Sequence, residues 1–363
     1  MIIEISKPDF RSIASNCELD LPKRWDGNDF HESLKLLYEH YQSILLTKTT
    51  PANLRKVTTI CNGISKCIEH YHNGFPNKAF HQMDSVMKKL IKHPLTVYRK
   101  SGWTDAFDQY DPLMLFRIRN VQNNTHYLRK DIFHTPYNLR SKISTCRYSI
   151  SGYPCLYLGT SLDLCCEEAK VGSFNDMTIT SRFKIQRNMR QNDGLAIDVI
   201  ELALKPKDFI DYDRNAPRNI RENNIIGRTR NFNELDLDSI DVMSAYLYWY
   251  PLIAACSFIR VNKQDPFASE YIIPQLLMQW ARNESNNEKL IGIRYFSCAS
   301  ERASELGFNY VFPVSCEKDP QNEKYCKVLA RSFKLTTPVY IHEFNTISDC
   351  EYHLQNSTDF DRI

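Results

Sequence analysis

The spacing of apolar residues changes near residue 105, and this change most constrains the fold. Before it, apolar residues recur every three or four positions, as along one side of a helix. After it, short runs with a period near two are interspersed with helical stretches. At 363 residues, the chain also exceeds the usual size of one domain. The sequence therefore predicts a small all-α domain over residues 1–105 and a larger domain over residues 106–363.

Three amphipathic helices are expected in the first domain. They begin near Asn28, at Pro51 and after Pro76, and each repeats one apolar stripe. Proline in the first turn, and Gly74 after the second helix, favour these boundaries. Residues 1–25 have weak periodicity, so we expect an extended lead-in there. Because helices with short connections must bury their stripes against each other, an antiparallel bundle is predicted.

Strands and helices follow in a mixed order in the second domain. Without regular βαβ alternation, this order favours an α+β core with a mixed sheet and flanking helices over a doubly wound sheet. The expected strands are residues 112–120, 155–158, 177–185, 195–200, 291–296, 310–314 and 337–342. The expected helices are residues 161–171, 240–259 and 271–282.

Composition and charge exclude several classes of protein. Hydrophobic residues make up 42% of the chain, which is typical of a globular protein. The 46 basic and 43 acidic residues leave a net charge of only +3, so nucleic acid is not an expected partner. Residues 242–259 are uncharged, but they barely reach membrane-spanning length and Pro251 interrupts them. We therefore expect a buried core helix there and no membrane segment.

Cysteines and histidines indicate the compartment and argue against a metal site. The first residues lack the basic, apolar and cleavage regions of a signal peptide, so a reducing, cytoplasmic setting is expected. No two of the twelve cysteines are spaced as CxxC, which disfavours zinc. The first domain is rich in histidine, but His70 and His72 would face different sides of a helix. We expect no metal.

Residues 131–170 combine a basic, aromatic run, a short apolar strand and a helix with two adjacent carboxylates. If the glycosidic bond of a dinucleotide is cut, a carboxylate can stabilise the cation that develops on the ribose. Glu168 is the candidate, because it lies about two turns into a helix that Ser161 would cap. Glu167 points roughly 100° away, so one of the two normally faces the site. The alternative for such a pair is a solvated helix face.

Two arginines and a tyrosine extend this candidate site. Arg117 and Arg147 can each present a planar fork to phosphate, and the alternative for each is a surface salt bridge. Tyr157 can stack on nicotinamide or a base, or it can belong to the core. His134 and Arg140 are second-rank ligand contacts.

The run FHTPYNLRSKISTCRYSISGYPCLYLGTSLDLCCEE resembles the long members of the RES-domain family. It shares their FH-P pattern, an RYS-I-G-PCLYLG segment and a cysteine-rich helix that ends in paired acids. LFRIRN upstream, with ASEYIIPQLLMQW and IGIRYFS downstream, extends the resemblance over roughly residues 110–345. RES proteins have a core like that of ADP-ribosyltransferases, and they include toxins that degrade NAD⁺ by hydrolysis or phosphorolysis.

The resemblance implies roles for individual residues. It assigns the family's two arginines, its strand tyrosine and its helix glutamate to Arg117, Arg147, Tyr157 and Glu168. In these roles the arginines bind pyrophosphate or an incoming phosphate, the tyrosine stacks on the nicotinamide side, and the glutamate stabilises the ribosyl cation. The family's serine has two candidates, Ser269 and Ser257.

The expected function is that of an NAD⁺-degrading enzyme acting as a bacterial toxin or defence effector. NAD⁺ is its substrate, inorganic phosphate is a potential co-substrate, and no further cofactor is expected. An antitoxin or regulatory protein and a second copy bound through the N-terminal helices are the expected partners. Two alternatives stay open, namely mono-ADP-ribosyl transfer to a macromolecule and a non-catalytic nucleotide sensor.

Overall fold

The computed structural model describes residues 5–93, 114–122, 125–171, 177–185, 196–210, 237–262, 264–285, 289–314 and 324–363. Its helices are α1 (Lys7–Ala14), α2 (Phe30–Leu46), α3 (Pro51–His72), α4 (Pro76–Leu90), α5 (Arg129–Ile132), α6 (Leu162–Ala169), α7 (Pro206–Ile210), α10 (Ile240–Ala255), α11 (Ile272–Glu284), α12 (Lys327–Ser332) and α13 (Ile347–Asn356). Its strands are β1 (Leu115–Asn120), β2 (Cys155–Gly159), β3 (Thr178–Ile185), β4 (Ala196–Leu202), β5 (Lys289–Phe296), β6 (Phe308–Pro313), β7 (Phe333–Thr336), β8 (Val339–Tyr340) and β9 (Phe360–Asp361).

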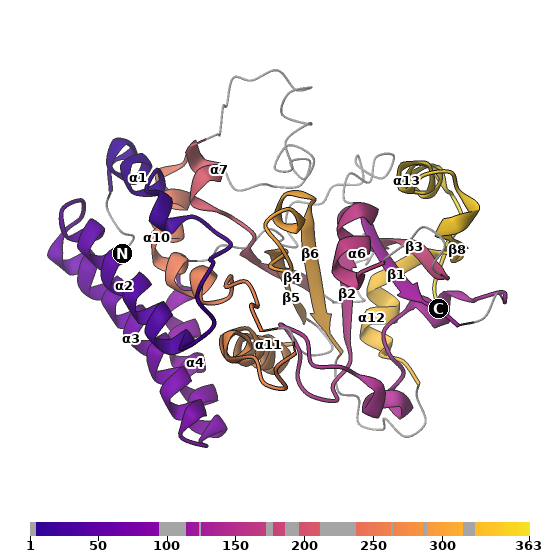
Figure 1. The fold of residues 1–363 in the computed structure, drawn as a ribbon, viewed down its shortest axis with the longest axis horizontal. Coiled ribbons are helices and arrows are strands. Elements are labelled where there is room, and N and C mark those ends of the chain that lie inside the picture. Colours follow the sequence, from indigo (N-terminus) through magenta and orange to yellow (C-terminus); the bar gives the residue numbers. More distant parts are fainter. Residues whose placement is uncertain are drawn as a thin grey trace.

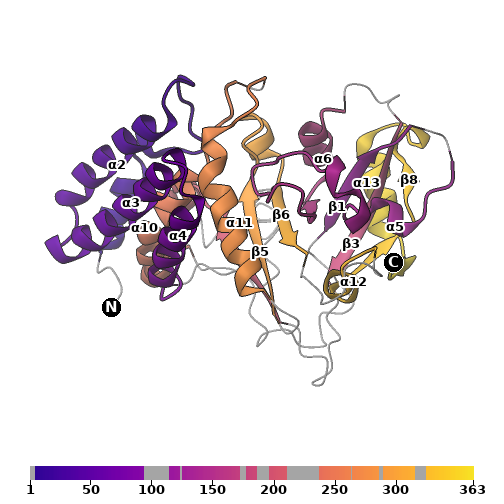
Figure 2. The same ribbon diagram turned by 90° about the horizontal axis from the view of Figure 1, so that it is seen from below.

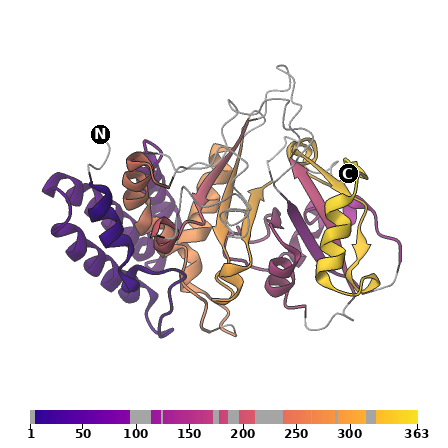
Figure 3. The ribbon, with the colours of Figure 1, turned by 90° about the horizontal axis from the view of Figure 1, so that it is seen from above.

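The elements are arranged along one long axis. Helices α1 to α4 lie at one end, α10 and α11 lie between them and the sheet, and α13 lies at the other end (Figure 1). The same order is visible from below and from above (Figures 2 and 3). Within the described residues, the strands form one mixed nine-stranded sheet. The predicted α+β class, with flanking helices, is therefore confirmed.

Helices α2, α3 and α4 form where the apolar stripes predict them. Asp29 and Thr50 cap α2 and α3, because each side chain accepts a backbone N–H of the first turn. Helix α3 packs against α2 and α4. A close approach at Gly63 makes this packing possible, since a Cβ atom there would lie 2.6 Å from the Val86 side chain. The predicted helical bundle thus exists at these positions.

The expected extended lead-in over residues 1–25 is wrong in the part that the structure describes. Lys7–Ala14 form α1, and Cys17–Leu19 form a 3₁₀ turn. Ser6 caps α1 by accepting a hydrogen bond from the Asp9 N–H at 3.2 Å. Eight residues supply only two turns of apolar pattern, which is too little for periodicity to reveal the helix.

The N-terminal helices share a hydrophobic core with the rest of the chain. Helix α3 packs on α10, and α4 packs on α11. The Tyr38 and Tyr41 hydroxyls each donate at 2.8 Å to a carbonyl of α10. One continuous cluster of buried apolar side chains includes members of both predicted domains. The boundary at residue 105 lies outside the described residues, so the division into 1–105 and 106–363 stays a prediction.

Helix α10 confirms the expected buried core helix. Every residue from Met243 to Ala255 is buried. The buried hydroxyls of Tyr246 and Tyr250 find hydrogen-bond partners inside the protein. They donate to the carbonyls of Leu204 and Leu19, at 3.2 and 3.0 Å. Among the helices that the structure describes, none combines the length and the apolar character needed to cross a membrane.

The sheet runs in the order β4-β5-β6-β2-β1-β3-β7-β9, and β8 pairs with β3. Strands β4 and β5 are parallel, and all the other pairs are antiparallel. Strand β1 pairs with β3 from Leu115 to Asn120, but with β2 only where Phe116 lies opposite Gly159. Strands β1 and β2 therefore diverge from this point. The divergence opens the sheet in its middle.

Six of the seven expected strands are confirmed within a few residues of their bounds. The seventh, residues 337–342, is wrong over most of its length, because only Val339–Tyr340 form a strand and Ile341–Glu343 form a 3₁₀ turn. Strand β7 was not expected. It directly follows α12 and contributes only four residues, so its pattern is too short to separate from that of the helix.

Candidate active site

A cavity of about 540 Å³ lies where β1 and β2 diverge. Residues of β1, β2, α6, β5 and β6 line it, together with segments before β2, between α10 and α11, and after β5. Its volume falls in the range of roughly 300–1,000 Å³ that is typical of small-molecule sites. Its charged lining residues are four bases and one acid: Arg117, Arg147, Lys170, Arg260 and Glu168. This excess of positive charge favours an anionic ligand.

Strand β1 carries Arg117 to the cavity. The Arg117 Nη1 atom donates to the Tyr157 carbonyl at 3.0 Å and so bridges the gap between β1 and β2. The Nε atom is buried and has no hydrogen-bond partner among the described residues. Burial lowers the pKa of Arg117 to about 10, so the side chain stays charged at neutral pH. A buried donor on a charged side chain needs an acceptor, and a ligand oxygen can supply it.

Helix α6 presents Glu168 to the cavity. The Asn309 side chain, on β6, donates from Nδ2 to Glu168 Oε1 at 2.7 Å. The neighbouring Glu167 turns away, and its Oε1 accepts a hydrogen bond from the Ser300 hydroxyl at 3.3 Å. Of the two carboxylates, only Glu168 lines the cavity. Adjacent helical residues point roughly 100° apart, which produces this separation.

The turn between β2 and α6 sets the position of Glu168. The Ser161 hydroxyl caps α6 by accepting a backbone N–H at 3.2 Å, and it donates to the Leu306 carbonyl at 2.8 Å. Glycine is required at Gly159, because a Cβ atom there would lie 2.7 Å from Cys165 Sγ. Helix α6 therefore packs closely on the end of β2, and its second turn reaches the cavity.

Three tyrosines, Tyr157, Tyr271 and Tyr295, give the cavity an aromatic lining. Tyr157, on β2, donates its hydroxyl hydrogen to the Tyr148 carbonyl. Tyr295, on β5, packs its ring 4.5 Å from the ring of Tyr148. Burial raises the pKa of both Tyr157 and Tyr295, so both stay protonated at neutral pH. Tyr157 and Tyr295 can therefore stack on a ligand, but they are poor acids and bases.

Arg147 also lines the cavity, but its guanidinium is already engaged. Its Nη1 and Nη2 atoms donate to the carbonyls of Cys256 and Phe258, at 3.2 and 2.7 Å. The side chain is only 9% exposed, so the alternative of a surface salt bridge is wrong for this residue. Its direct contact with phosphate stays a prediction, and the two carbonyl partners do not favour it.

His134 and Arg140 do not line the cavity. His134 is fully buried, and its Nε2 atom accepts a hydrogen bond from the Cys326 N–H at 2.8 Å. Burial lowers the pKa of His134 to about 4, so the ring is neutral. The Arg140 guanidinium packs over the rings of Tyr137 and Tyr153. Both predicted contacts therefore hold local structure together next to the site.

The two serine candidates also lie outside the cavity lining. Ser257 donates its hydroxyl hydrogen to the Ile253 carbonyl at 2.6 Å, at the end of α10. Ser269 begins a 3₁₀ turn (Ser269–Tyr271) before α11. The structure thus brings together four predicted residues, Arg117, Arg147, Tyr157 and Glu168, and separates them from His134, Arg140 and Ser269.

Several lining residues are not predicted by the sequence pattern. Asn309 had a detectable signal, since it is a polar residue inside the apolar strand FNYVFP and is only 7% exposed. Tyr271 and Tyr295 lie within the motifs EYIIPQLL and IGIRYFS, but tyrosines are common in cores. Arg260 had no local signal, because its neighbours in the chain form no motif.

Within the described part of the chain, no three histidine, cysteine, aspartate or glutamate side chains come together in a way that could hold a metal ion.

Comparison with known proteins gives one informative similarity. The chain is 29% identical over 362 residues to a Bacillus subtilis (strain 168) protein described as "Putative toxin YopC". The match covers 96% of this chain and 73% of that protein, so it includes the N-terminal helices as well as the sheet. No family model matches the chain, and no solved structure matches it.

Proposed function

We propose that this chain is a toxin that cleaves the bond between nicotinamide and ribose in NAD⁺. The observation that carries the proposal is the cavity between β1 and β2, lined together by Arg117, Tyr157 and Glu168. The similarity to "Putative toxin YopC" supports the toxin part. The resemblance of residues 110–345 to RES-domain proteins supports NAD⁺ as the substrate.

Glu168 has the chemistry that this cleavage requires. When the bond between ribose C1′ and nicotinamide N1 breaks, its electron pair leaves with nicotinamide and positive charge develops on the ribose. A carboxylate beside that carbon stabilises the charge. The hydrogen bond from Asn309 holds the Glu168 carboxylate in one orientation, so little reorganisation is needed as the charge appears.

Arg117 and Tyr157 fit the two ends of the reacting part of NAD⁺. The unpartnered Nε of Arg117 offers a charged donor to a diphosphate oxygen. The Tyr157 ring offers a flat surface to nicotinamide, because its hydroxyl is already bound to the Tyr148 carbonyl. Water or inorganic phosphate then adds to C1′ and completes the reaction, and the positive lining of the cavity would attract phosphate.

Product analysis tests the proposal. The full-length chain is incubated with NAD⁺ labelled in its adenosine half, with and without inorganic phosphate, and the products are identified by chromatography and mass spectrometry. We expect free nicotinamide with ADP-ribose, or with phosphorylated ADP-ribose if phosphate is the acceptor. Label on a protein or nucleic acid would instead indicate mono-ADP-ribosyl transfer. Intact NAD⁺ that binds saturably would indicate a sensor.

The toxin part needs a separate test in cells. Induced expression of the wild-type chain should arrest growth and lower cellular NAD⁺, whereas Glu168→Gln at the same protein level should do neither. Growth arrest by both proteins would separate toxicity from NAD⁺ cleavage.

A further inference from the structure

The chain that leaves α10 is held from two sides. On one side, Arg147 donates to the carbonyls of Cys256 and Phe258. The carbonyls of Ser257 and Ile259 are bound instead by the N-terminal region. Four successive carbonyls are thus shared alternately between Arg147 and the N-terminal region. Because each of these carbonyls has a hydrogen-bond donor, the extended segment is held in place without a regular sheet.

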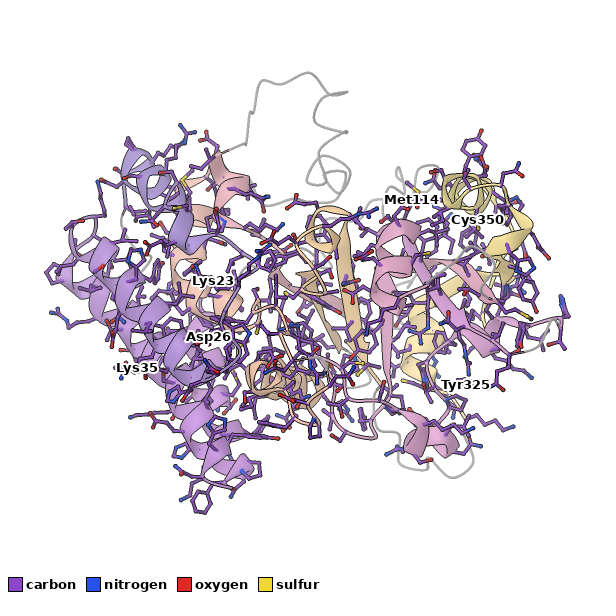
Figure 4. All side chains as sticks on the ribbon, viewed as in Figure 1. Lys23, Asp26, Lys35, Met114, Tyr325 and Cys350 are labelled. Carbon is purple, nitrogen blue, oxygen red and sulfur yellow. The ribbon has the colours of Figure 1, made fainter. Side chains whose placement is uncertain are left out.

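The N-terminal partners of this segment are Lys23 and Trp25. The Lys23 N–H donates to the Ser257 carbonyl at 2.8 Å, and the Ile259 N–H donates to the Lys23 carbonyl at 2.9 Å. The Trp25 indole N–H donates to the Ile259 carbonyl at 2.8 Å. Lys23 lies between the N-terminal helices and the sheet (Figure 4). The N-terminal region therefore braces a segment that reaches the cavity.

Arg260 is the next residue of the segment, and it lines the cavity. It is half-buried, and its Nε and Nη2 atoms donate to the carbonyls of Asn262 and Asp265, at 3.2 and 2.5 Å. Its Nη1 atom has no partner among the described residues. The Tyr271 ring contacts two guanidinium groups, since its centre lies 5.5 Å from that of Arg260 and 4.8 Å from that of Arg147. Arg147 and Arg260 each donate to two carbonyls, but Arg147 is buried whereas Arg260 is half-buried, so Arg260 is the more accessible of the two to a ligand.

We propose that Arg260, rather than Arg147, binds the phosphate groups of the ligand, and that Lys23 and Trp25 are positioning residues that hold Arg260 in place. The choice of a nucleotide diphosphate as the ligand rests on the proposed function. Arginine stays charged at all accessible pH values and presents several donors, which suits a phosphate group. The N-terminal region thereby becomes part of the binding site through the segment that it braces.

The assignment of Arg260 is tested by binding of ADP and adenosine, measured by calorimetry on the full-length chain. Arg260→Gln should weaken ADP binding about tenfold to a hundredfold, because a hydrogen bond between charged groups is lost. Adenosine, which lacks phosphate, should bind both proteins alike. Arg331→Gln is the matched control, since Arg331 is exposed on α12 and outside the cavity lining.

The outcomes separate this assignment from the proposed activity. Equal ADP affinity in the wild type and Arg260→Gln, or no ADP binding by the wild type, overturns the assignment. A wild-type chain that leaves NAD⁺ intact but loses ADP affinity with Arg260→Gln supports the assignment and rejects the activity. A wild-type chain that cleaves NAD⁺ with a KM unaffected by Arg260→Gln supports the activity and overturns the assignment.

The positioning role is tested with two matched variants. Trp25→Phe removes the donor to the Ile259 carbonyl and keeps an aromatic ring, and Tyr38→Phe removes a donor to the Pro251 carbonyl on α10. Both should lower the melting temperature by similar amounts. Only Trp25→Phe should weaken ADP binding, about threefold to tenfold, and raise the KM for NAD⁺ by the same factor at unchanged kcat. Equal ADP affinity in the two variants overturns the positioning role.

Discussion

The two walls of the cavity are built in different ways. The strand wall consists of Arg117, Tyr157, Glu168 and Asn309, which stand on β1, β2, α6 and β6. The loop wall consists of Arg147, Arg260 and Tyr271, which stand outside the sheet. Sheet pairing and helix capping hold the strand wall, whereas side-chain donors to backbone carbonyls hold much of the loop wall.

The contrast between Arg117 and Arg147 shows what this difference means. Both are arginines next to the same cavity, and the same role was predicted for both. Strand pairing already supplies hydrogen-bond partners to much of the backbone around Arg117. Its buried Nε atom therefore has no backbone carbonyl to bind in the part of the chain that the structure describes, and it can donate to a ligand. Arg147 must satisfy two carbonyls of an irregular segment, which uses both of its terminal nitrogens. The buried carbonyls of this segment thus occupy the terminal nitrogens that Arg147 would need for a ligand.

The largest expected effect tests the strand wall. Glu168→Gln should lower kcat about 10²–10³-fold with little change in ADP affinity, because the charge that Glu168 meets exists mainly in the transition state. Steady-state kinetics and calorimetry measure the two quantities. Glu167→Gln is the matched control, since Glu167 lies one residue away against Ser300 and should keep its turnover. Full turnover by Glu168→Gln would remove the catalytic role of the strand wall.

The next effect concerns the loop wall. Arg147→Met should lower the free energy of unfolding by about 3 kcal/mol, because the buried carbonyls of Cys256 and Phe258 lose their donors. Arg147→Lys should lower the free energy of unfolding by less, since an ammonium group can still reach one carbonyl. Urea unfolding measures both. A fully stable Arg147→Met variant that no longer binds ADP would show that Arg147 serves the ligand as Arg117 does, and the contrast between the walls would fail.

His134 tests a predicted ligand residue that belongs to neither wall. Burial lowers its pKa from 6.5 to about 4, so the folded state favours the neutral ring. Its contribution to stability is present above pH 6.5 and is lost as the pH falls through 4. Between pH 7.5 and 4.5, this loss amounts to about 2.5 kcal/mol of unfolding free energy. Urea unfolding should show a smaller loss over that range for His134→Gln. An identical pH dependence in the two proteins would contradict the neutral, structural role.

The smallest effect tests how the strand wall places Glu168. Gly159→Ala should lower the free energy of unfolding by about 2 kcal/mol and should also lower kcat. The new Cβ lies 2.7 Å from Cys165 Sγ and must displace α6. Adding Cys165→Ala removes the obstructing atom, so the double variant should recover much of both losses. Melting temperature and kcat measure the recovery. A Gly159→Ala variant with normal stability and turnover would mean that the Cys165 side chain can turn aside without displacing α6, and the positioning role of Gly159 would fail.

Local pattern accounts for what the sequence determined by itself. Some features depend only on residues a few positions apart in the chain. They are the apolar stripes of α2, α3 and α4, the strand β2 and the cap at Ser161. The facing of Glu168 rather than Glu167 follows from the same local geometry. The short helix α1 and the four-residue strand β7 were not predicted, because their apolar patterns are too short to recognise.

Only the tertiary structure decided which partners these groups meet. Arg147 binds a carbonyl 109 residues away, Asn309 holds a carboxylate 141 residues away, and Trp25 donates to a carbonyl 234 residues away. No periodicity or spacing in a single sequence encodes such contacts, because they depend on how distant segments pack. The point where β1 and β2 diverge is equally long-range, since their pairing joins residues 43 positions apart at Phe116 and Gly159. Local chemistry thus selected Arg117, Tyr157 and Glu168 of the strand wall, whereas packing between distant segments added Asn309 and assembled the loop wall.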